Sequence, residues 1–276
     1  MLESIIKMFS YSFLVRAFVA GTLISLCASL LGVNLVLKRY SMIGDGLSHV
    51  GFGALAIATA LNVAPLSVAI PVVIAAAFLL LRITESSKIK ADAAIALIAT
   101  GAIAIGVMVI SMSSGMNVDV FNYMFGSILA MNKSDMALSV TLSIVVILAY
   151  LGFYNKIFSI TFDESFAKAT GLRTDLFNML IALLTAITIV LGMRLMGSLL
   201  ISAIIIFPSL SAMRAFKSFK GVTIAAALIS VFSFISGITI SYFISTPTGA
   251  SVVLVNIFCF LIMTLVGFIR RKKAYI

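Results

Sequence analysis

Long apolar runs dominate this chain, and most of them are about 20 residues long. A helix of that length crosses the roughly 30 Å of hydrocarbon in a bilayer, where only helices and closed barrels satisfy their own backbone hydrogen bonds. Of the 276 residues, 62% are hydrophobic and 10% are charged. Soluble domains average about 45–50% and about 25%. The sequence therefore predicts an all-α, polytopic membrane protein.

Nine apolar segments are candidate membrane spans, and the charged residues fall mostly at the breaks between them. The segments cover residues 12–37, 44–61, 65–83, 91–113, 136–154, 176–192, 196–212, 222–244 and 250–269. The second and seventh are short, so we expect eight or nine transmembrane helices in a single domain that occupies residues 1–276. A further apolar segment, 118–130, is too short to span and is expected to be re-entrant or interfacial.

The basic residues predict the orientation of these spans, because Lys and Arg are retained on the cytoplasmic side of a membrane. The basic run at 270–273 places the C-terminus in the cytoplasm. Counting spans backwards puts the 156–173 loop, the basic group at 214–220 and Lys38 on the same side. The net charge of +10 follows from this asymmetry and from attraction to anionic lipid, so no nucleic-acid partner is expected.

Asp45 and His49 interrupt an apolar segment, and His49 is the only histidine in the chain. On a helix, their spacing of four residues puts a carboxylate and an imidazole on one face, one turn apart. An ionisable group inside a membrane costs roughly 3 kcal/mol and is by default a functional hypothesis. Carboxylate and imidazole together suit a divalent ion such as zinc, manganese or iron. The alternative is a polar pair that holds neighbouring helices together.

Two protein ligands leave a four-coordinate ion half-satisfied. A second copy of the chain across a symmetry axis, or water, would have to supply the other ligands. The two cysteines, Cys27 and Cys259, both fall in apolar spans, where cysteine most often packs as a small hydrophobic group. We therefore expect no cysteine cluster to complete the site.

The loop at 161–171 has the pattern of a short, independently capped helix. Thr161 is the expected N-cap, Glu164 stands at the third helical position of a capping box, and Gly171 is the expected C-terminal stop. A short polar helix between two spans could dock into a groove on a soluble partner. The alternative is a plain connecting helix that lies at the membrane interface.

Two further stretches break the hydrophobic pattern. In 197–208, Ser198 and Ser202 form a small-xxx-small pair that lets helices approach closely, and Pro208 is expected to kink or end that helix. Residues 246–250 are expected to form a tight turn on the outer face. By themselves these stretches describe only how helices pack and turn.

Taken in order, the four stretches resemble those of the membrane permeases of ABC importers that take up zinc, manganese or iron. The basic pair Lys38-Arg39 followed by Gly44-Asp45-Gly46-Leu47-Ser48-His49 resembles that family's Gly-Asp-Ala-Leu-Ser-His segment. The region 163–171 is similar to its coupling region, 197–208 to its Gly-x-Leu-Leu stretch ending in proline, and 247–250 to its Pro-Thr-Gly turn. Each motif is weak alone, but four in register from residue 38 to residue 250 indicate this family.

The resemblance implies an ABC importer permease fold, a homodimer, two cytoplasmic ATP-binding subunits and an extracytoplasmic metal-binding protein, all at a bacterial cytoplasmic membrane. It also implies metal contacts at Asp45 and His49, and no permanently bound cofactor. The residues it assigns to ATPase coupling, in a cytoplasmic helix at 161–171, are Asp163, Glu164, Ala167, Ala169 and Gly171. Those it assigns to structural positions are Gly44, Gly197, Pro208, Pro247 and Gly249.

One departure from the family pattern is Gly46, where alanine is common, and it is not expected to affect ligation. The transported ion is expected to be Zn²⁺ or Mn²⁺. Zinc is favoured over manganese or iron because the 118–130 segment resembles zinc permeases more than manganese ones.

The chain has no Gly-x-x-x-x-Gly-Lys-[Ser/Thr] loop, so it is expected to be no enzyme and to have no catalytic residues. Energy must then come from a partner or from an ion gradient. The main alternative is therefore a gradient-driven secondary metal transporter. An intramembrane aspartyl protease is disfavoured because such chemistry needs a second carboxylate beside the first, and the other aspartates lie in or beside loops, with Asp92 at the head of a span.

Overall fold

The computed structural model describes residues 10–86, 91–113 and 133–273, and within these ranges the secondary structure is helical without a strand. The short segment 118–130 lies outside the described residues. The helices are α2 (Ser12–Leu37), α3 (Ile43–Ala60), α4 (Pro65–Ser86), α5 (Ala91–Met112), α7 (Lys133–Gly152), α8 (Tyr154–Phe162), α9 (Glu164–Ala169), α10 (Thr174–Met196), α11 (Ser198–Ala215), α12 (Phe219–Ile244) and α13 (Thr248–Lys273).

Seven helices of the described ranges are long and apolar enough to cross a membrane. They are α2, α4, α5, α7, α10, α12 and α13, so the expected count of eight or nine is slightly too high. Two of the nine predicted spans do not meet this criterion. They correspond to α3 and α11, which are the second and seventh segments and were noted as short in the sequence. Asp45 and His49 lower the hydropathy of α3, and the apolar part of α11 is confined to Leu200–Ala215.

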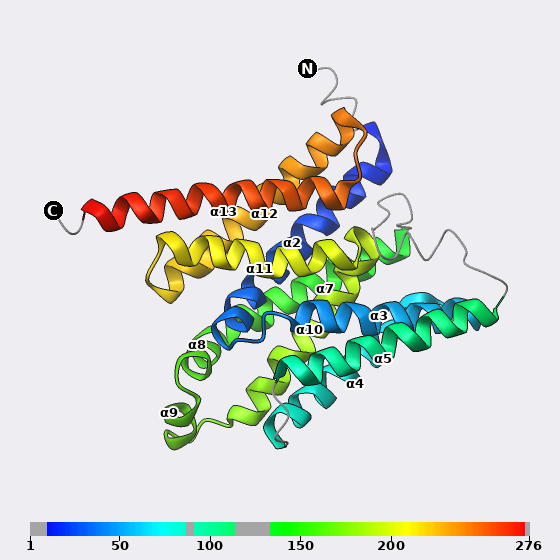
Figure 1. Cartoon of the computed structure of the whole chain (residues 1–276), viewed down its shortest axis with the longest axis horizontal. Helices are drawn as coiled ribbons and strands as arrows, with labels where there is room; N and C mark the ends of the chain where they lie inside the picture. The colour runs from blue at the N-terminus through cyan, green and yellow to red at the C-terminus, as the bar shows by residue number, and fades with distance from the viewer. Residues whose placement is uncertain (1–9, 87–90, 114–132, 274–276) are drawn as a thin grey trace.

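The helix α2 lies at the centre of the bundle and packs against α7, α10, α11 and α12. In Figure 1, α3, α4 and α5 group together on one side of α2, and α11, α12 and α13 group on the other. Gly46 of α3 faces Ile95 of α5, and Gly53 of α3 faces Ala102 of α5. The helices α3 and α5 therefore run in the same direction, and α4, which lies between them in the chain, runs in the opposite direction.

The ends of α8 and α9, the connection between α11 and α12 and the C-terminal end of α13 lie at one end of the bundle, the left of Figure 1. Three contacts join helices at that end. Lys38, just after α2, forms an ion pair with Glu164 of α9, and Phe219 of α12 packs on α8. Arg270 of α13 donates a hydrogen bond to the carbonyl of Ala215 at the end of α11. At the opposite end, Arg194 of α10 is paired with Asp135 of α7 at 2.7 Å. This asymmetry is typical of a membrane protein that follows the positive-inside pattern.

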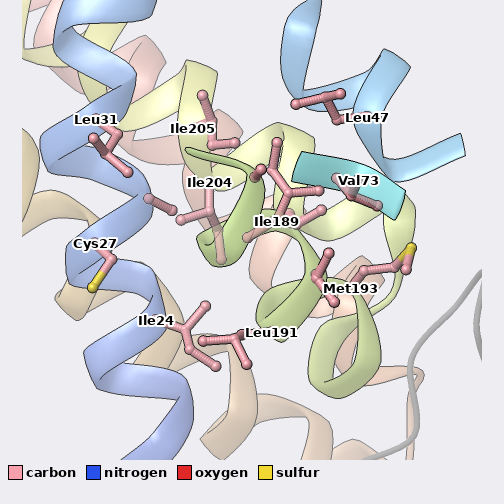
Figure 2. Close-up of a cluster of buried hydrophobic side chains, with 14 of the residues drawn as sticks. Ile24, Cys27, Leu31, Leu47, Val73, Ile189, Leu191, Met193, Ile204 and Ile205 are labelled. Atoms are coloured by element: carbon pink, nitrogen blue, oxygen red, sulfur yellow. The ribbon is translucent and has the colours of Figure 1, made fainter. Parts of the chain in front are cut away.

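The core is built from aliphatic side chains of four helices around α2. Figure 2 shows side chains of α2, α3, α4, α10 and α11 meeting there, and the labelled ones are Ile24, Cys27, Leu31, Leu47, Val73, Ile189, Leu191, Met193, Ile204 and Ile205. Cys27 and Cys259 are both free and buried, as the sequence predicted, and the Cys27 thiol donates to the Ser143 carbonyl across α2 and α7.

The crossing of α2 and α11 depends on Gly32. A Cβ atom added at Gly32 would overlap the carbonyl oxygen of Ile205, which is backbone and cannot turn aside. Close approach of two helix backbones through a glycine is the usual way in which membrane helices gain packing energy. Since α11 also packs against α3, this crossing positions the helix that carries Asp45 and His49.

Gly32→Ala is therefore expected to lower the free energy of unfolding in detergent by about 1–3 kcal/mol, because the two helices must separate to admit the methyl group. The measurement is the thermal or denaturant midpoint of the purified protein. Gly101→Ala on α5 is the matched control, because a Cβ there meets no atom within 4 Å. An equal loss in both variants would show that the α2–α11 crossing tolerates a side chain.

Candidate functional site

Helix α3 holds Asp45 and His49 between two neighbouring helices. Gly44 faces Ser202 and Ile205 of α11, and Gly46 faces Ile95 of α5. Small residues at these positions let α3 approach both neighbours closely. Asp45 lies in the first helical turn, and His49 follows one turn later on the same face, which opens between α5 and α11.

The two side chains lie close enough to bind one ion together. The His49 Nε2 atom is 3.5 Å from Asp45 Oδ2. Ligand distances near 2.1 Å at a tetrahedral zinc ion imply a separation of about 3.4 Å between two ligand atoms. The observed separation therefore matches two adjacent ligand positions without a change of rotamer.

The Asp45 and His49 side chains are both partly exposed. The His49 side chain is 23% exposed and that of Asp45 is 36% exposed. Among the described residues, neither side chain has a hydrogen bond or ion pair other than the one that joins them. Among the described residues, the pair therefore does not link α3 to a neighbouring helix through a hydrogen bond or ion pair.

The described residues of one chain do not form a complete metal centre. No group of three or more His, Cys, Asp or Glu side chains comes together in the described ranges. Ser48, beside the pair, is fully buried, and its hydroxyl donates to the Asp45 carbonyl. If Asp45 and His49 bind an ion, the described part of the chain supplies no further ligand of these types beside them.

Gly46 is more constrained than the sequence indicated. A Cβ atom at Gly46 would come within 2.5 Å of Cγ2 of Ile95. Alanine would therefore require Ile95 to shift, and with it the contact of α5 with the helix that bears Asp45 and His49. This chain combines glycine with a β-branched neighbour at the place where the resembled family often has alanine.

The 161–171 segment differs from its prediction in where the helix begins. Helix α8 continues through Thr161, whose hydroxyl donates to the Ile157 carbonyl at 2.7 Å and lies 3.1 Å from Asn34 Oδ1. Asp163, and not Thr161, is the N-cap of α9, because its carboxylate accepts from the amide of Phe166 at 2.8 Å. Gly171 follows α9 with a φ of +87°, as expected for a glycine stop.

Glu164 connects α9 to α2 and α10 and does not form a capping box. One of its carboxylate oxygens lies 3.0 Å from Lys38 Nζ, and the other accepts from the Asn178 amide at 2.7 Å. Lys38 Nζ also donates to Asn178 Oδ1 at 2.7 Å. These three residues, which we name the Lys38 triad, tie the short helix to the turn that leads into α3. From the sequence, Lys38 was a cytoplasmic charge and part of the basic pair in the family motif, and its contact with Glu164 was not predicted.

A second buried link lies beside the triad. Asn34, which is fully buried, donates to the Tyr150 hydroxyl at 3.1 Å and faces the Thr161 hydroxyl. The end of α2 therefore contacts α7, α8 and α9 through polar groups. Such buried polar contacts keep the elements in one register.

Helix α9 has one buried side and one exposed side. Ala167 is fully buried against Ile160 and Phe177, which anchors the helix to α8 and α10. Ala169 is exposed on the outside, and Phe166 is 62% exposed beside it. An exposed aromatic on a short capped helix suits insertion into a pocket of a partner protein. Phe166 is a candidate contact that the sequence motifs did not single out.

The remaining glycines and prolines that the motifs assign to structural positions lie between helices, inside α11 and at the start of α13. Gly197 has φ of +86° and ψ of 161°, a conformation reserved for glycine, and joins α10 to α11. Pro208 does not end α11, which continues to Ala215. Pro247 stands just before α13, after the left-handed Ser245, and Gly249 lies inside the first turn of α13.

The profile of the ABC 3 transport family matches residues 10–267 of the chain. Among similar proteins, a probable metal transport system membrane protein of Thermotoga maritima is 32% identical over 254 residues, covering 92% of this chain and 89% of the relative. The manganese transport system membrane protein MntC of Halalkalibacterium halodurans is 28% identical, covering 90% and 85%. The high-affinity zinc uptake system membrane protein ZnuB of Haemophilus influenzae is 27% identical, covering 91% and 97%.

Two solved structures share the arrangement of helices. PsaBC from Streptococcus pneumoniae in complex with Fab is similar with a TM-score of 0.85 and 26% sequence identity over 95% of both chains. An inward-facing conformation of a putative metal-chelate type ABC transporter has a TM-score of 0.76 and 14% identity over 91% of this chain and 85% of that one. The second likeness concerns the fold alone.

Proposed function

Because the chain belongs to the ABC 3 transport family, we propose that it is the membrane permease of an ATP-driven importer and that Asp45 and His49 bind the transported divalent metal. The observation that carries this proposal is the 3.5 Å separation of Asp45 Oδ2 and His49 Nε2 on an open helix face. Carboxylate and neutral imidazole together favour divalent transition metals over alkali ions.

The proposal includes a homodimer in which the second copy supplies another Asp45 and His49. Four ligands from two chains would complete a tetrahedral ion, which two ligands from one chain do not. An extracytoplasmic metal-binding protein would deliver the ion near 246–250 and 117–119, of which the latter lies outside the described residues. The C-terminal end of α13 would then lie in the cytoplasm.

A separate ATP-binding subunit would contact α9 on the cytoplasmic side. The exposed Phe166 and Ala169 form the contact face, and Asp163 and Gly171 define where the helix begins and ends. Movement of α9 would reach α3 through the Lys38 triad, because Glu164 binds the residue that follows α2. Nucleotide-driven motion would in this way change access to Asp45 and His49.

Zinc and manganese are both proposed cargoes, because relatives named for each ion have similar identities of 27% and 28%. We place zinc first, since an imidazole ligand favours zinc and zinc binds such sites more tightly than manganese. The expected preference for zinc from the 118–130 segment rests on residues outside the described ranges.

The test is metal uptake into proteoliposomes that hold the chain with its ATPase and binding protein, compared for zinc, manganese and iron with and without ATP. We expect uptake only in the complete system with ATP. Uptake by the chain alone under an imposed proton gradient would instead assign a secondary transporter and would remove the coupling role of α9.

A further inference from the structure

A cavity lies between α7, α8 and α12, and none of its lining residues belongs to the proposed transport path. Its volume is about 530 Å³, and α2 forms its floor through Leu30. Lysine, asparagine, tyrosine and threonine side chains gather at one end, and leucine and isoleucine side chains at the other. The lining residues used below are Tyr154, Asn155, Lys220, Thr223, Ile224 and Leu228.

The polar end of the cavity is suited to an anion. Lys220 stands in the first turn of α12, where its ammonium group adds to the positive end of that helix. Asn155 offers an amide in the same cavity, and the buried Tyr154 hydroxyl lies beside the Thr223 hydroxyl. Burial raises the pKa of Tyr154, so this hydroxyl stays protonated and can donate. None of the described residues that line the cavity is acidic.

The other end of the cavity is suited to a hydrocarbon chain. From Lys220, the lining follows successive turns of α12 through Ile224 to Leu228, which leads away from the basic end of the bundle. Ile224 is 52% exposed and Leu228 is 66% exposed. The start of α12 is closed against α8 by the stacking of Phe219 on Tyr154, Phe158 and Phe162. The cavity, which we call the groove, is thus closed at the start of α12 and open along the following turns of that helix.

We propose that this groove binds an anionic phospholipid, with its phosphate on Lys220, Asn155 and Tyr154 and one acyl chain along Ile224 and Leu228. A basic pocket between membrane helices at the level of the headgroups is a recognised lipid-binding arrangement. The bound lipid would contact α7, α8 and α12, with Leu30 of α2 beneath it.

The test measures lipids retained by native mass spectrometry after incubation with equimolar phosphatidylglycerol and phosphatidylcholine. The chain alone and the complex with its ATPase are both measured. We expect the wild type to retain phosphatidylglycerol about fivefold over phosphatidylcholine, the effect of one lysine at an anionic headgroup. Lys220→Gln should bring this ratio close to one. Lys217→Gln is the control, because Lys217 is exposed in the same region but does not line the groove.

A second pair of variants tests whether filling the groove displaces the lipid. Gly152 lines the groove, and a Cβ there meets no atom within 4 Å, so Gly152→Leu should fill the groove without strain and lower retention of both lipids. Gly101→Leu, also in open space on α5, should leave retention unchanged. Equal retention of both lipids by the wild type, or a ratio that survives Lys220→Gln, would overturn the proposal. Lipid bound to the chain alone but excluded from the complex would also overturn it, by assigning the groove to a partner.

Discussion

Asp45→Ala is expected to lower ATP-driven metal uptake by more than about tenfold, since even residues that only orient metal ligands commonly change affinity by 10–100-fold. In the proposed site, the change removes the negative charge that would compensate the partly dehydrated cation and leaves His49 without its carboxylate partner. It should not prevent folding, because the Asp45 side chain is partly exposed and binds no described side chain other than His49. Uptake of radioactive zinc and manganese into proteoliposomes measures the effect.

Two companion variants make that result specific. His49→Gln keeps a polar side chain of similar length but removes the imidazole nitrogen, and we expect a comparable loss of uptake. Thr59→Ala is the control on the same helix, because Thr59 donates only to the Leu55 carbonyl one turn away, at the far end of α3. The assignment of the metal site is wrong if Asp45→Ala protein, assembled with its partners, transports at the wild-type rate.

Breaking the Lys38 triad is expected to uncouple ATP hydrolysis from uptake. In Glu164→Ala, α9 keeps its Asp163 cap and its Ala167 anchor but loses its ionic contact with Lys38. The Glu164 side chain is 45% exposed, so this pair contributes at most about 1 kcal/mol to stability. The effect on transport should be much larger, with several-fold more ATP consumed for each ion imported. The measurement is the ratio of ATP hydrolysed to metal taken up.

The charge-swapped double variant Lys38→Glu/Glu164→Lys separates coupling from simple damage. Asn178 can reverse its amide to serve either arrangement, so the double variant should recover part of the coupling that each single variant loses. Lys156→Ala is the control for the loss of a lysine in this region. The Lys156 ammonium group lies over the rings of Phe153 and Phe177 and is not part of the Lys38 triad. A double variant as impaired as the sum of the two singles would argue against a direct link.

Much of the helical pattern was predictable because it depends on local hydrophobicity. The first span was placed at residues 12–37, where α2 is found, and the segments that became α5 and α12 were close to their final bounds. Asp45 and His49 could likewise be placed on one face from helical periodicity alone. The family could be identified because four motifs keep their order along the chain.

The start of α9 could not be predicted because two capping residues compete there. Thr161 and Asp163 are both good N-caps by type. In the structure, α8 continues through Thr161, and the Thr161 hydroxyl contacts Asn34, which is distant in sequence. Asp163 then caps the next helix, α9. With the helix start moved, Glu164 leaves its capping-box position and reaches Lys38.

The sequence by itself determined that the chain is a helical membrane protein, which segments are apolar, and that a carboxylate and an imidazole share a helix face. These properties follow from composition and from spacing within one helix. Only the tertiary structure decided that Lys38 meets Glu164, that Gly46 lies against Ile95, and that the Asp45 and His49 face stays open between α5 and α11. Those contacts join residues distant in sequence, and their pairing depends on how whole helices pack.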